Sequence, residues 1–116
     1  MPDRFSDRGP DQPSNDDVRA QAAFAAKRSP AGIGAAVERS GYSDGAHFWE
    51  CIISDGTQWH FIRVLGVDLP PAPGLGTDDI EHGIEAFAAT LPELDRIDAL
   101  LNANPLHVDR SGTVST

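Results

Sequence analysis

The tripeptide Ser-Asp-Gly occurs twice, at 43–45 and 54–56, and a run of aromatic and aliphatic residues follows each copy. Asp and Gly favour the tight turns of β-hairpins, because glycine adopts positive φ without steric cost. Two such turns, one soon after the other, predict a three-stranded antiparallel meander with strands at about 33–42, 46–53 and 57–65. A β-sheet is therefore expected at the centre of the chain.

The length of each turn sets which residues pair across the strands. Three-residue loops would give one apolar face, which we predict to be the core: Val37, Trp49, Cys51, Ile53, Trp59 and Phe61. The opposite face would be mixed: Glu38, Phe48, Glu50, Ile52, Gln58, His60 and Ile62. A two-residue Asp-Gly turn would instead pair Cys51 with His60 and divide the aromatic residues between the faces. We favour the three-residue loops because they separate apolar from polar residues.

Residues 30–42 fit either a strand or a helix. Gly41 could end a helix that begins near Pro30, and Ile33 and Val37 have helical spacing. Two interior glycines would each cost about 1 kcal/mol in such a helix. The doubled turn favours the strand.

Three helices are predicted around the sheet, which makes the fold α+β. The first covers about 16–28, where acidic residues suit the start and basic residues the end of a helix. Two C-terminal helices are expected at about 78–90 and 92–102, because apolar residues recur there every three or four positions. Residues 1–14 hold too few large apolar side chains to fold and predict a disordered tail. Residues 15–116 would then form a single domain.

Composition excludes several classes of protein. Cys51 is the only cysteine, so an internal disulfide and a multi-cysteine zinc site are excluded, and we expect a buried, unreactive thiol. No apolar run suits a signal peptide or a membrane span, which predicts a soluble, cytoplasmic protein. The four histidines lack the spacing of metal ligands, and no cofactor is expected. The net charge of −9 argues against direct binding of nucleic acid.

The acidity is concentrated in the C-terminal part of the chain. Two basic and nine acidic side chains fall in residues 66–116. Seven of these carboxylates lie on the two predicted helices, and we predict that they bind a partner: Asp78, Asp79, Glu81, Glu85, Glu93, Asp95 and Asp98. Such a row could occupy the basic, nucleic-acid-binding surface of another protein, as small phage or plasmid inhibitors of host defence do. A non-catalytic, acidic protein–protein interaction module is therefore expected.

Two alternatives stay open. The favoured register lays Glu38, Glu50 and His60 side by side, and two carboxylates beside an imidazole could act as acid and base in a small enzyme or ligand-binding domain. Alternatively, the chain is the structural subunit of a homo-oligomer, since a thin sheet with a second apolar patch needs a second cover. The residues of that patch are Phe48, Ile52 and Ile62.

Overall fold

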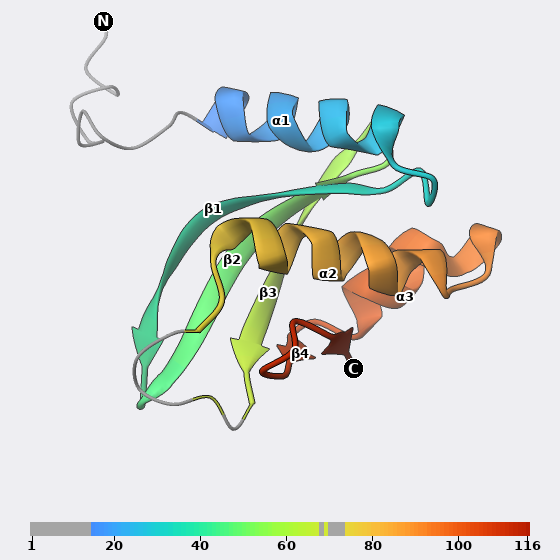
Figure 1. Cartoon of the computed structure of the whole chain (residues 1–116). Helices are drawn as coiled ribbons and strands as arrows, with labels where there is room; N and C mark the ends of the chain where they lie inside the picture. The colour runs from blue at the N-terminus through green and yellow to red at the C-terminus, as the bar shows by residue number, and fades with distance from the viewer. Residues whose placement is uncertain (1–14, 68, 70–73) are drawn as a thin grey trace, which may run out of the picture.

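A computed structural model describes residues 15–67, 69 and 74–116. In this part of the chain, three α-helices pack around a five-stranded mixed sheet (Figure 1). The predicted α+β class is confirmed, but the sheet is larger than the predicted meander. The tail predicted at 1–14 lies outside the described residues.

The first three strands form the antiparallel meander: β1 (Gly34–Ser43), β2 (Ala46–Ser54) and β3 (Trp59–Gly66). The ambiguous segment before the first turn is therefore a strand. Two short strands extend the sheet beyond β3 in the order β1-β2-β3-β4-β5. β4 (Leu106–Val108) pairs in parallel with the end of β3, and β5 (Val114–Ser115) pairs antiparallel with β4.

The helices cover both faces of the sheet. α1 (Asn15–Arg28) lies over one end of the strands, and α2 (Thr77–Ala89) crosses the molecule on the other side (Figure 1). α3 (Arg96–Asn102) is shorter than the predicted second C-terminal helix, because a separate 3-10 turn, η2 (Glu93–Asp95), precedes it. The loop from β3 to β4 thus carries α2, η2 and α3, as a parallel crossover requires.

The first Ser-Asp-Gly forms a two-residue turn, not the predicted three-residue loop. Ser43 pairs with Ala46, which leaves only Asp44 and Gly45 in the turn. Both adopt positive φ, 54° and 82°, as in the primed turns that suit the twist of a hairpin.

The second Ser-Asp-Gly forms a longer loop. Ser54 pairs with Trp59, so four residues lie between the paired ends. The Oδ1 atom of Asp55 accepts hydrogen bonds from the backbone N–H groups of Thr57 and Gln58, both at 2.9 Å. These bonds hold the Asp55 side chain inside the loop and favour a loop of four residues.

The changed loop length overturns the predicted register of β3. Cys51 pairs with Ile62, and not with Trp59 or His60. Ile62 is buried in the core, whereas Trp59 and Phe61 lie on the opposite face and are 45% and 50% exposed. Two aromatic residues that were predicted to be core are therefore on the surface.

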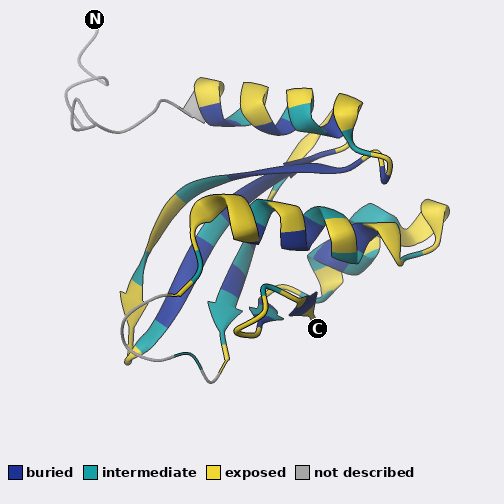
Figure 2. Cartoon of the chain, in the orientation of Figure 1, coloured by how far each residue is buried: buried dark blue, intermediate teal, exposed yellow. Residues whose placement is uncertain are grey.

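The main core lies between the sheet and the two C-terminal helices. Its fully buried members include Trp49, Ile53, Ile84 and Leu100. A smaller cluster joins α1 to the other face of β1 and β2, and it consists of Val18, Ala22, Ala36 and Ile52. Figure 2 shows the buried surfaces of α1 and α2 turned toward the strands and their exposed surfaces turned away.

Candidate functional site

The predicted acid–base layer does not form. Glu50 pairs with Arg63 across β2 and β3, whereas His60 pairs with Ile53. Because successive side chains of a strand alternate between faces, Glu50 and His60 point to opposite sides of the sheet. Glu38 lies at a β-bulge in β1. The prediction that these three side chains converge is therefore wrong.

Cys51 is confirmed as a buried thiol. It is fully enclosed in the main core, and burial raises the pKa of its thiol. A neutral, inaccessible sulfur is a poor nucleophile. Within the described residues, no group of three or more His, Cys, Asp or Glu side chains is arranged to hold a metal ion.

Two of the seven carboxylates that are predicted to bind a partner contact the backbone of β1. Glu81 Oε2 accepts a hydrogen bond of 2.8 Å from the backbone N–H of Val37 in β1, and Glu85 interacts with the backbone of Ala35. Burial raises the pKa of both carboxyl groups. β1 is an edge strand, whose free N–H groups would otherwise offer a template to another strand. α2 therefore covers this edge of the sheet.

The other five predicted carboxylates are exposed: Asp78, Asp79, Glu93, Asp95 and Asp98. Asp78 and Asp79 occupy the first turn of α2, and Asp79 accepts a hydrogen bond from the N–H of Gly76 at 3.0 Å. The remaining three lie within four residues of Leu94 in the sequence, in η2 and the first turn of α3. We call these four residues, Glu93, Leu94, Asp95 and Asp98, the acidic corner.

Leu94 is 94% exposed at the centre of this corner. The η2 turn that presents it is closed by a hydrogen bond of 3.0 Å from the N–H of Asp95 to the carbonyl of Pro92. In the single helix predicted at about 92–102, Leu94 would lie on the apolar side with Ile97, Leu100 and Leu101. The early 3-10 turn changes its direction, so the side chain points to solvent.

The sheet face beside α1 is only partly covered. The patch predicted there for a homo-oligomer is wrong, because Phe48, Ile52 and Ile62 are all buried. Phe48 lies beneath two guanidinium groups, those of Arg39 at 5.3 Å and Arg63 at 4.5 Å from its ring centroid. The exposed aromatic residues of this face are Trp59 and Phe61.

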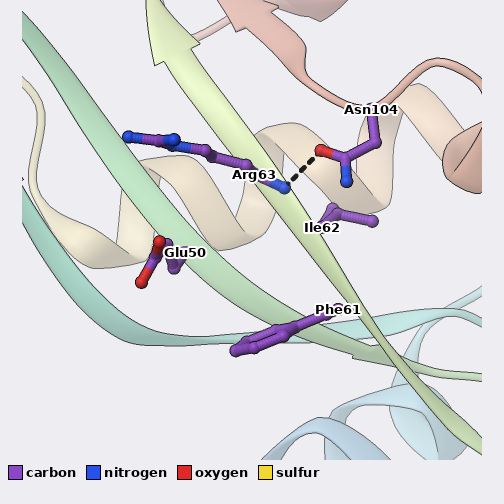
Figure 3. A pocket seen from close by; sticks show the side chains of 5 residues that line it. All are labelled: Glu50, Phe61, Ile62, Arg63 and Asn104. Carbon is purple, nitrogen blue, oxygen red and sulfur yellow. Dashed lines mark hydrogen bonds between the residues drawn. The ribbon is translucent and has the colours of Figure 1, made fainter.

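A small pocket of about 110 Å³ opens beside Phe61 (Figure 3). Its lining residues are Glu50, Phe61, Ile62, Arg63 and Asn104. Asn104 Oδ1 accepts a hydrogen bond of 2.7 Å from the backbone N–H of Arg63, while the Arg63 side chain extends away across β2 (Figure 3). Pockets for small molecules usually measure roughly 300–1,000 Å³, so this one is too small to hold such a ligand.

Comparisons with known proteins give no family: no family model, no curated protein and no solved structure matches the chain. In the described part of the chain, none of the helices has the length and apolar character needed to cross a membrane.

His47 is a buried titratable group that the sequence did not single out. Its ring stacks between Tyr42, at 4.8 Å, and Trp49, at 4.0 Å between centroids. Its Nδ1 atom is buried and has no hydrogen-bond partner among the residues that the structure describes. Burial lowers the pKa of this imidazole. The period-two spacing of Trp49 and His47 was the signal that both share the core-facing side of β2.

We expect His47 to make the fold less stable at acidic pH. Because the folded pKa is lowered, the unfolded chain binds the proton more readily below about pH 6.5, and the free energy of unfolding falls as the pH falls. Urea unfolding at pH 7.5 and pH 5.5 measures this loss. His47→Phe keeps the aromatic stack and removes the titration, so the loss should be smaller in the variant. An equal loss in both proteins would contradict the assignment.

Proposed function

We propose that this protein is a non-catalytic protein-binding domain that docks through its acidic corner on a partner with a basic surface. The observation that carries the proposal is the exposure of Leu94 among three carboxylates. An exposed apolar side chain on a closed turn, with charged residues next to it in the sequence, has the form of an interface anchor with a polar rim.

The leucine and the carboxylates would contribute in different ways. Burying a leucine side chain contributes about 1.5–3 kcal/mol, which supports affinity. Exposed carboxylates mainly accelerate and orient the encounter with a basic surface, and salt screens their effect. The partner should therefore present an apolar pocket bordered by Lys or Arg.

Asp78 and Asp79 extend the acidic surface at the other end of α2. Together with the corner they give five exposed carboxylates, which suits a partner whose basic surface normally holds a phosphate backbone. An inhibitor of a nucleic-acid-binding protein is the form of this function that we favour. Glu81 and Glu85 are left out of the surface because they bind β1.

The corner can be tested with immobilised protein and an extract of the native host, with retained proteins identified by mass spectrometry. Leu94→Ser and the triple variant Glu93→Gln/Asp95→Asn/Asp98→Asn should each weaken retention of a specific partner at least about tenfold, equivalent to about 1.4 kcal/mol. Retention by the wild type should fall at high salt.

The matched control removes three charges elsewhere, with Asp16→Asn, Asp17→Asn and Asp44→Asn combined. It has the same net charge as the triple variant and should retain the partner as the wild type does. If a specific partner is retained equally by all four proteins, the acidic corner is not its docking site.

A further inference from the structure

In the described part of the chain, the first half of β3 has one side that no other strand covers. Carboxylates of α2 bind the first part of β1, at Ala35 and Val37, and β5 at the other end is only two residues long. β3, however, pairs with β4 only from Val64 onward. In the described part of the chain, no strand pairs with the first half of β3 on this side.

Backbone hydrogen bonds show which residues face the open edge. The N–H groups of Arg63 and Val67 point toward β4, since they donate to Asn104 Oδ1 at 2.7 Å and to the Val108 carbonyl at 3.0 Å. Alternation along the strand then turns the N–H and C=O groups of Phe61 and Trp59 the same way. Asn104 occupies the position beside Arg63, so the open edge consists of residues 59–61.

We propose that a second copy of this chain pairs antiparallel with this edge, in a register centred on His60. Trp59 then exchanges two backbone hydrogen bonds with Phe61 of the partner subunit, and Phe61 does the same with the partner's Trp59. His60 faces the partner's His60 across the two-fold axis. Two five-stranded sheets become one continuous sheet.

The side chains of the edge are complementary to themselves in this register. Trp59 and Phe61 project from the same face and are 45% and 50% exposed. Each aromatic ring therefore meets the other kind of ring across the interface, and aromatic pairs are among the favourable cross-strand pairs. Edge strands usually carry charged side chains that prevent pairing with another chain, whereas this edge carries exposed aromatic side chains.

Charge also favours a second copy at this place. Two arginines near this face are ion-paired within the chain, Arg19 with Asp16 at 2.7 Å and Arg39 with Glu50 at 2.8 Å, and the guanidinium of Arg63 lies 4.5 Å from the ring centroid of Phe48. The five exposed carboxylates of α2, η2 and α3 belong to elements on the other side of the sheet. Two chains of net charge −9 can therefore meet here with little repulsion.

Sedimentation equilibrium of the full chain from about 1 µM to about 500 µM tests the proposal, because an interface this small should be weak. The wild type should show a concentration-dependent monomer–dimer equilibrium. Phe61→Ser removes one aromatic contact per chain, and His60→Lys places two ammonium groups at the two-fold axis. Each should weaken dimerisation at least about tenfold. Urea unfolding checks that both variants are folded.

Leu94→Ser is the matched control, since it makes the same kind of change on the acidic corner. It should dimerise as the wild type does, which separates this proposal from the proposed function. Hydrogen exchange at high concentration should slow at the amides of Trp59 and Phe61. A wild type that stays monomeric throughout, a dimer that Phe61→Ser and Leu94→Ser affect equally, or protection elsewhere would overturn the proposal.

Discussion

Trp49→Ala is expected to lower the free energy of unfolding by about 3–5 kcal/mol, the loss usual when a buried aromatic side chain is truncated in a core. Trp49 is 1% exposed and packs in the main core beside His47. Alanine would leave a cavity that the rigid sheet cannot fill. Because small domains are stable by only about 5–15 kcal/mol, urea unfolding should show a large shift of the midpoint.

The second tryptophan of the chain provides the control. Trp59 is 45% exposed on the open face of β3, so Trp59→Ala should cost less than about 1 kcal/mol. The emission of Trp49 alone, in that variant, should be blue-shifted and should move to longer wavelength on unfolding. Equal losses of stability at the two positions would contradict the observed register of β3.

This contrast marks the limit of what the sequence could predict. The doubled Ser-Asp-Gly correctly predicted two hairpins, because Asp and Gly favour the turns themselves. It could not fix the register, since the first copy closes in two residues and the second in four. The difference depends on the residues after the tripeptide, where Asp55 binds the N–H groups of Thr57 and Gln58. The length of this loop decides which side chains of β3 face the core, so an incorrect length reversed the predicted faces.

The acidic residues show a second limit. Spacing alone placed Glu81 and Glu85 on α2, but only packing shows that their side of the helix meets the free N–H groups of β1. The exposure of Leu94 was missed for a similar reason, because the 3-10 turn before α3 breaks the apolar pattern of a longer helix. The pairing of β4 and β5 with the meander could not be predicted, because strands of three and two residues are too short for periodicity to show their register.

Gly34→Ala is expected to detach α1 from the sheet. A methyl group at Gly34 would lie 2.2 Å from the backbone nitrogen of Ala26 and 2.3 Å from the carbonyl oxygen of Ala22. Backbone atoms of a helix cannot rotate away, so α1 must move as a whole. The cost should be about 3 kcal/mol, at the upper end of the range for overpacking.

The backbone conformation of Gly34 gives no second reason for Gly34→Ala to lose stability. Its φ is not among the positive values of this chain, so alanine fits the strand and on conformational grounds would be neutral or mildly stabilising. Urea unfolding measures the stability, and limited proteolysis measures how readily α1 is cut. Gly74→Ala, where a methyl group meets no atom of the described residues within 4 Å, should change neither.

Displacement of α1 would also enlarge the open face of the sheet. Ala36 and Ile52, which α1 now covers with Val18 and Ala22, would join Phe61 in one apolar surface. Folded Gly34→Ala protein should therefore associate more strongly than the wild type in sedimentation experiments, and less specifically, because exposed apolar area drives association. Two results together would contradict the close contact between α1 and β1: a free energy of unfolding within about 0.5 kcal/mol of the wild-type value, and an unchanged rate of cleavage in α1.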